Sequence, residues 1–229
     1  MIDPNKKEAA PVNTSDVCHR AFELIATKQY GDAEKLLASN MARTDDDASI
    51  ALYHSVMGVL FKVQGEYKTA WRHYQRAEKL LPDDPALKII SARLLISEFA
   101  EYGQAIKKAK KVLATIPGNP VFAHQAYTTM GLAYCGKGQR KKAVSMLETS
   151  WGEDFQGFVS AKNVDFELVE ALVRRGWGLD SCRSFLAKAV DFAARTGEEN
   201  YLTLFTRMLN AFDNEHPQPV PAGPSTEVP

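Results

Sequence analysis

The stretch from Gly131 to Gly138 contains residue types that could bind a nucleotide phosphate. It reads GLAYCGKG, close to the phosphate-loop pattern G-x-x-x-x-G-K-S/T, in which backbone N–H groups and the lysine hold phosphate and the hydroxyl binds magnesium. Glycine stands here in place of the hydroxyl residue. A working loop also follows a β-strand, whereas the preceding HQAYTTMGLAYC has the apolar spacing of a helix. We therefore predict a turn after a helix and no nucleotide site.

Histidine and cysteine could bind a metal only where they converge. His124 and Cys135 are eleven residues apart on one predicted helix, which separates them by about 16 Å. His54 and His73 occupy equivalent positions and could approach each other, but no third ligand accompanies them. The cysteines are widely spaced, with no CxxC pair: Cys18, Cys135 and Cys182. The sequence predicts no metal, no cofactor, and buried reduced thiols in a cytoplasmic protein.

The net charge and the hydropathy of the chain limit the classes of partner that it can bind. Lys plus Arg and Asp plus Glu each total 28, so the formal net charge is zero. This balance argues against general nucleic-acid binding, which needs a positive field, and the KKAKK stretch from Lys107 is interpreted as a solvated helix face. Apolar residues never run for 18 positions, so no membrane insertion is predicted.

The two ends differ from the body of the chain. The first residues, MIDPNKKEAAPVN, are polar and lack the apolar stretch of a signal peptide. The sequence from Pro217 holds five prolines in PQPVPAGPSTEVP, which cannot sustain a helix. We predict disorder over residues 1–13, a helical body over 14–214 and a Pro-rich disordered tail over 215–229.

Two internal segments share a set of offsets. In the segments that begin at Tyr53 and Tyr127, a Met-Gly pair is followed by an aromatic residue three positions after the glycine. A second glycine follows after seven positions and an alanine after twelve: Gly58, Gly65 and Ala70; Gly131, Gly138 and Ala143. Repeats of this kind indicate stacked helical hairpins, since one hairpin cannot bury its own apolar face.

The pattern resembles the tetratricopeptide repeat, W-x2-L-G-x2-Y, then A-x3-F, then P. The segment 51–84 fits best, through Met57, Gly58, Phe61, Ala70, Tyr74, Ala77 and Pro82. The resemblance implies an all-α, right-handed α-α superhelical solenoid of about five hairpins: 14–50, 51–84, 85–120, 121–156 and a degenerate 163–196. A capping helix is expected over 198–214. We expect eleven helices and no sheet.

The resemblance also implies where a partner binds. In this family the first helix of each hairpin lines a concave channel. Carrying those positions over predicts a partner-binding groove, with half of its apolar members expected to pack between repeats instead. The predicted groove residues are Cys18, Phe22, Ile25, Leu52, Ser55, Val59, Lys62, Val63, Ile89, Arg93, Ile96, Gln125, Thr128, Leu132, Arg174 and Arg175.

These features predict a non-enzymatic adaptor or scaffold that holds a peptide segment of another protein, with homo-oligomerisation left open. Cys18 and Phe22 stand where chaperone-binding members clamp Glu-Glu-Val-Asp tails with Lys and Asn, which argues against that function. The alternative is a secretion chaperone that keeps a hydrophobic client soluble. An enzyme would need the loop WGEDFQGFVSAKN to build a pocket around Asp154 and Lys162.

Overall fold

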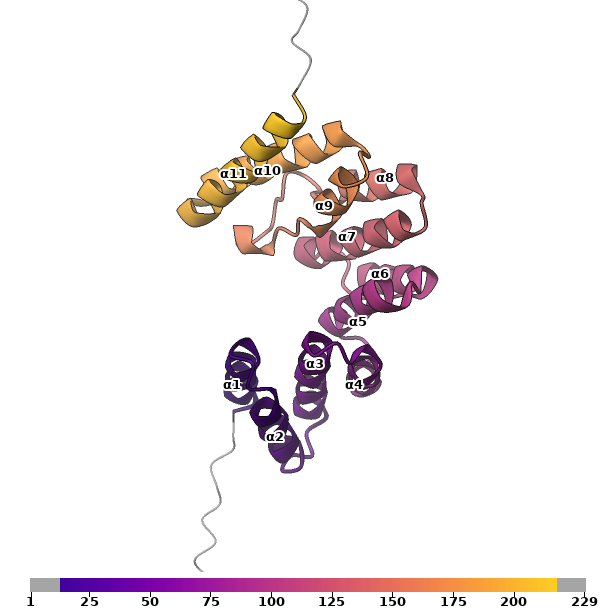
Figure 1. Ribbon diagram of the computed structural model, residues 1–229, viewed down its shortest axis with the longest axis vertical. Helices are drawn as coiled ribbons and strands as arrows, with labels where there is room; N and C mark the ends of the chain where they lie inside the picture. The colour runs from indigo at the N-terminus through magenta and orange to yellow at the C-terminus, as the bar shows by residue number, and fades with distance from the viewer. Residues whose placement is uncertain (1–12, 218–229) are drawn as a thin grey trace, which may run out of the picture. The chain divides into compact units, whose positions relative to one another are not determined.

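The computed structural model describes residues 13–217, and within them the chain forms eleven α-helices, one short 3-10 helix and no β-strand (Figure 1). The all-helical prediction is therefore confirmed. The predictions of disorder at the two ends concern mainly residues 1–12 and 218–229, which lie outside the described residues.

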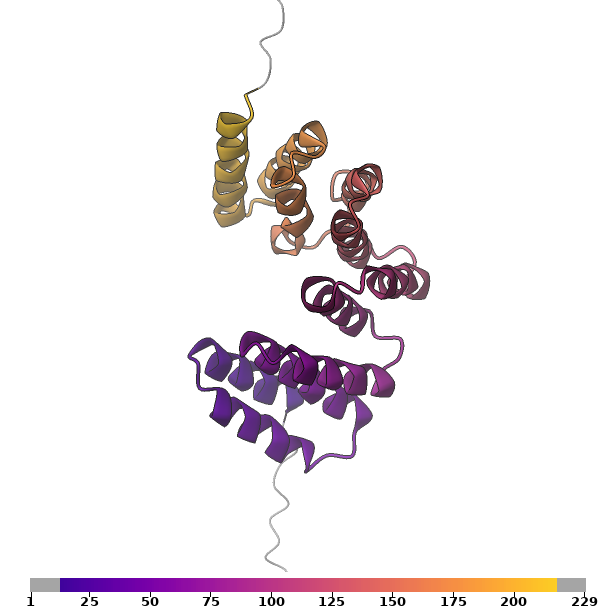
Figure 2. The same cartoon turned by 45° about the vertical axis from the view of Figure 1, so that its right-hand side comes forward.

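The helices form five hairpins followed by a last helix. Their bounds are α1 (Thr14–Ala26), α2 (Tyr30–Met41), α3 (Asp47–Val63), α4 (Tyr67–Leu80), α5 (Pro85–Phe99), α6 (Tyr102–Thr115), α7 (Pro120–Gly136), α8 (Arg140–Ser150), η1 (Ala161–Asn163), α9 (Glu167–Val173), α10 (Leu179–Thr196) and α11 (Glu199–Glu215). The chain divides into two compact units, Met1–Lys108 (unit 1) and Ala109–Pro229 (unit 2), which are described separately. In unit 2, α11 packs beside α10 (Figure 2).

The first helices of four hairpins begin at a side-chain cap. Asn13, Asp46, Asp84 and Asn119 are extended, and their side-chain oxygens accept a hydrogen bond from a backbone N–H in the first turn. Such caps stabilise a helix by about 1 kcal/mol each. Pro85 and Pro120 follow two of these caps in the first turn, where a missing N–H costs nothing.

Each hairpin turn has a residue with a left-handed φ just after its first helix, which explains the spacing of the second glycines. These residues are Lys28, Gly65, Ala100, Gly138 and Gly176, and the fifth turn has another at Gly178. In four turns the next N–H bonds to the carbonyl five residues back, as from Glu66 to Phe61 and from Gln139 to Tyr134. In the third turn the N–H of Glu101 donates to the carbonyl of Leu95, six residues back. This wider turn accounts for the thirteen residues from Ala92 to Ala105, one more than from Gly58 to Ala70.

Ala100 has a φ of 53° in this third turn, where the other turns mostly use glycine. A Cβ strains this conformation by about 1–2 kcal/mol. We expect Ala100→Gly to stabilise the protein by about 0.5–1 kcal/mol, because the released strain exceeds the entropy that glycine loses on folding. Thermal denaturation of the two proteins checks this, and an unchanged or lower melting temperature would contradict it.

Gly58 allows α3 and α4 to approach closely in unit 1. A Cβ built on Gly58 would lie 2.2 Å from Cε1 of Tyr74, whose side chain is completely buried. The contact confirms that the repeat glycine is a close-packing position. Gly131 differs, since its Cβ would meet Leu168 of α9, in the following hairpin, at 2.3 Å.

The core of unit 2 includes the loop between α8 and α9. Phe155 and Phe158 of this loop are buried against Phe185 and Phe192 of α10. The short α9 leaves Glu170 exposed, and the degenerate fifth hairpin packs through these aromatic side chains.

Candidate functional site

Exposed apolar side chains gather on the first helices of unit 1. Phe22 on α1 is 44% exposed, and Leu52 and Val63 on α3 are 44% and 54% exposed. Leu52, Val59 and Val63 recur at intervals of seven and four, so they lie on one stripe of α3. We call Phe22, Leu52, Val59, Lys62 and Val63, which are predicted groove residues on the packed helices α1 and α3, the first-helix face.

The concentration on this face is more informative than any single exposed residue. Isolated exposed apolar side chains are ordinary, whereas contiguous ones mark interaction surfaces. Among residues 13–217, six large apolar side chains are exposed, and Phe22, Leu52 and Val63 are half of them. Lys62 is also exposed beside the stripe and supplies a charge at its edge.

Several predicted groove residues are buried and offer almost no surface to a partner. They are Cys18, Ile25, Ser55, Ile89 and Thr128, the last with no exposed area. Burial also raises the pKa of the Cys18 thiol above its usual value, so Cys18 is a packing residue. These side chains pack between neighbouring helices and have little contact with solvent.

The remaining predicted groove residues are partly or fully exposed. Arg93, Ile96, Gln125 and Leu132 are partly buried, and Arg174 and Arg175 are exposed. Arg175 donates to the carbonyl of Ala171 and lies over the ring of Trp177. Gln125, Leu132 and the two arginines belong to unit 2, so they form a separate set from the first-helix face.

His54 and His73 join α3 to α4, which confirms the prediction that they approach each other. Their Nδ1 atoms are 3.0 Å apart, and the ring of Phe61 stacks on His73. One Nδ1 must donate and the other accept, so the pair is suited to a neutral state. Burial, followed by the charges of His54, Arg76 and Arg72, lowers the pKa of His73 from 6.5 to about 4.

We expect this pair to make unit 1 sensitive to acid. Because the folded-state pKa of His73 lies below its unfolded value, the unfolded state takes up protons first as the pH falls from about 6.5 to 4. Stability should decrease through this window by about 1–2 kcal/mol, allowing for partial exposure. His73→Asn should weaken the pH dependence of the unfolding midpoint in urea. An identical pH profile for the variant would contradict this account.

A pocket of about 410 Å³ lies in unit 2 beside Asp154, between Glu153, Gln156 and Arg195. An enzyme would need a pocket at this place, so the loop meets that one requirement. Asp154 is held by an ion pair with the amino group of Lys188, and Arg195 donates to the Asp154 carbonyl. Glu198 accepts hydrogen bonds from the Ala161 N–H and the Ser160 hydroxyl, which lower its pKa. These groups hold the loop in place.

In residues 13–217, no group of three or more His, Cys, Asp or Glu side chains could hold a metal ion. Over the same range, none of the helices combines the length and apolar character needed to span a membrane.

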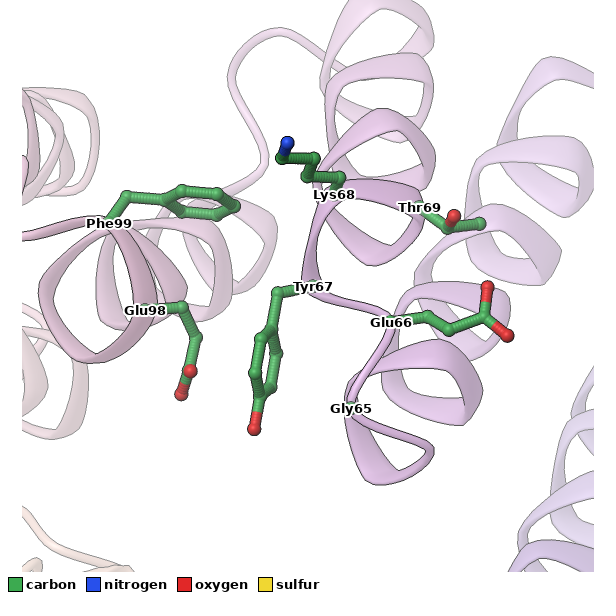
Figure 3. Close-up of a pocket in the computed structure, with 7 residues that line it drawn as sticks. All are labelled: Gly65, Glu66, Tyr67, Lys68, Thr69, Glu98 and Phe99. Atoms are coloured by element: carbon green, nitrogen blue, oxygen red, sulfur yellow. The ribbon is translucent and has the colours of Figure 1, made fainter.

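A second pocket, of about 470 Å³, lies in unit 1 between the turn before α4 and the end of α5. Tyr67 and Phe99 border it, with Lys68 and Glu98 nearby (Figure 3). None of its lining residues was a predicted groove residue.

Comparisons with solved structures define the class of fold. A thermophilic TPR protein of Thermus thermophilus matches with a TM-score of 0.58 and 17% identity, over 86% of this chain and 100% of that one. The type IV pilus biogenesis factor PilW matches with a TM-score of 0.59 and 16% identity, over 86% and 92%. The TPR-like repeats of a putative kinesin light chain of Podosopora anserina match with a TM-score of 0.53 and 14% identity, over 90% and 97%.

No family model and no curated protein sequence matches the chain. The similarity to the solved structures is therefore a similarity of fold. The chain has the tetratricopeptide-repeat fold, built from the helical hairpins that the repeat offsets predicted.

The sequence did not indicate the role of His124. Its side chain is fully buried, with Nδ1 2.9 Å from the Ser150 carbonyl and Nε2 accepting from the Asp165 N–H at 2.8 Å. Both partners are backbone groups in or beside an irregular loop, which residue types cannot reveal. The one available signal was the pair of phenylalanines in that loop, Phe155 and Phe158, which marks it as buried.

Proposed function

We propose that the protein is a non-enzymatic adaptor that binds a segment of another protein on its first-helix face. The observation that carries this proposal is the concentration of exposed apolar side chains at Phe22, Leu52 and Val63. An apolar stripe of this kind is suited to the anchor residues of an extended or helical peptide. Lys62 at its edge would favour a partner with some negative charge.

The solved structures with the same fold are consistent with this role. One of them, PilW, is a type IV pilus biogenesis factor. Assembly of a pilus requires proteins to contact one another. We also propose a cytoplasmic location, since all three cysteines are free and buried, which suits a reducing compartment.

The alternative is a secretion chaperone for a hydrophobic client. The same apolar face would serve it, so the nature of the captured protein distinguishes the two functions. A chaperone would hold an otherwise insoluble client in a one-to-one complex that salt does not disrupt. An adaptor would hold a partner that is soluble alone.

The test compares capture of proteins from native lysate by the wild type and by Phe22→Glu/Leu52→Glu. Two buried charges in the interface should reduce recovery of a true partner by at least about tenfold. Leu204→Glu is the control, because Leu204 is 45% exposed on α11 of unit 2 and matches Leu52 in type and exposure. Equal recovery by wild type and the double variant would contradict the proposal.

A further inference from the structure

The outer face of α4 carries an uncompensated row of positive charge. Lys68, Arg72, Arg76 and Lys79 are all exposed and are spaced by four, four and three residues. At 100° per residue they fall within an arc of about 80° of the helix. Gln75 lies at the edge of this arc, which holds no acidic residue.

Within the described part of the chain, these four charges stand without an ion-pair partner on the surface of α4. Like charges four residues apart destabilise a helix by about 0.2–0.5 kcal/mol per pair. In residues 13–217, no carboxylate pairs with any of the four cations. Glu78, the one acid of α4, binds the amino group of Lys108 at 2.6 Å and accepts from Ser91. The row therefore lacks a structural explanation and is available to an external anion.

The pocket beside α4 adjoins one end of this row. Lys68 is both the first cation of the row and part of the pocket lining. Tyr67 and Phe99 are the two aromatic residues of its lining (Figure 3). Glu66 and Glu98 also line the pocket, so they disfavour a carboxylate inside it. The two aromatic side chains give the pocket an apolar lining suited to an apolar side chain.

We propose that this face binds an acidic segment of a partner protein that carries one apolar anchor. The anchor enters the pocket between Tyr67 and Phe99, and the following carboxylates meet Arg72, Arg76 and Lys79. The row from Lys68 to Lys79 is about 16 Å long, the length of about five residues of extended chain. Arginine is suited to this role because its guanidinium binds a carboxylate through two parallel hydrogen bonds.

This surface is independent of the first-helix face. It lies on a second helix, and none of its residues belongs to Phe22, Leu52, Val59, Lys62 and Val63. A protein partner is favoured over nucleic acid because the whole chain has no net positive charge. Either surface can therefore be disabled while the other is retained, and the two proposals fail separately.

The test is fluorescence anisotropy of the full chain with a labelled peptide, Phe-Ser-Gly-Glu-Glu-Asp-Glu-Glu. Arg72→Glu/Arg76→Glu should weaken its binding by at least about tenfold, and binding should weaken as salt increases. Arg140→Glu/Lys141→Glu, which changes two exposed cations of α8, is the matched control and should bind like the wild type. Circular dichroism confirms that each variant is folded.

Two further arms test the anchor and the class of partner. Replacing the peptide's phenylalanine by alanine should weaken binding to the wild type, and should make no difference to a Phe99→Ala variant. Equal binding of the peptide to wild type and Arg72→Glu/Arg76→Glu would overturn the proposal. The wild type could instead bind duplex DNA or phosphatidylserine vesicles more tightly than the peptide. If Arg72→Glu/Arg76→Glu abolished that binding, the assignment to a protein partner would be overturned.

Discussion

Replacing His124 by alanine should destabilise unit 2 by about 3–5 kcal/mol. The side chain has no exposed area and lies among the rings of Phe155, Phe158 and Phe185, so its loss opens a cavity in the aromatic core. The change also removes both hydrogen bonds that connect α7 to the Ser150 carbonyl and to the Asp165 N–H. Both backbone groups would then lose their hydrogen bond to the imidazole.

The two hydrogen bonds also define which nitrogen of the His124 ring carries the proton. Since Nε2 accepts from the Asp165 N–H, it is unprotonated, and the proton of the neutral ring is on Nδ1. Calorimetry of wild type and variant measures the effect. His19→Ala on the exposed side of α1 is the control and should change stability by less than about 0.5 kcal/mol. Similar melting curves for His124→Ala and wild type would show that the loop is held by other contacts.

The second large effect is expected at Gly58. Even a methyl group there would lie 2.2 Å from the Tyr74 ring, which is 1% exposed. Gly58→Ala should cost about 1–3 kcal/mol by overpacking, and Gly58→Leu should cost more. Urea denaturation of both variants gives the free energies of unfolding.

Gly31 provides the control for this effect. It lies within α2, and a Cβ built on it meets nothing within 4 Å. Gly31→Ala should therefore stabilise the protein by about 0.5–1 kcal/mol, because alanine has the higher helix propensity. A double variant, Gly58→Ala/Tyr74→Leu, should recover part of the lost stability. If Gly58→Ala behaved like Gly31→Ala, the close approach of α3 and α4 would be wrong.

Much of the fold was predictable because small residues and turns recur at constant offsets. The twelve-residue spacing from Gly58 to Ala70 predicted a hairpin, and Gly65 lies in the left-handed turn between its helices. The approach of His54 to His73 followed from their equivalent positions on the two helices. Lys28 and Ala100 carried no such signal, since each adopts a glycine conformation without being glycine.

The site was less predictable than the fold. Repeat positions indicate which helix side is inward, but they do not distinguish Leu52, which is exposed, from Ile89, which is buried. That difference depends on how tightly each pair of neighbouring helices packs. The charged row of α4 could have been read from the four-residue spacing of Lys68, Arg72 and Arg76. The pocket that adjoins it requires α5, so it appears only in three dimensions.

The most direct test of the adaptor proposal is site-specific photocrosslinking in cells. A photoreactive phenylalanine analogue is placed at Leu52, in the first-helix face, and in a second protein at Leu204, which has the same residue type and exposure. We predict a discrete crosslinked protein from position 52 that is absent at position 204 and is lost when Phe22→Glu is added. Crosslinks from position 204 alone, or crosslinks from position 52 that Phe22→Glu leaves unchanged, would contradict partner binding on the first-helix face.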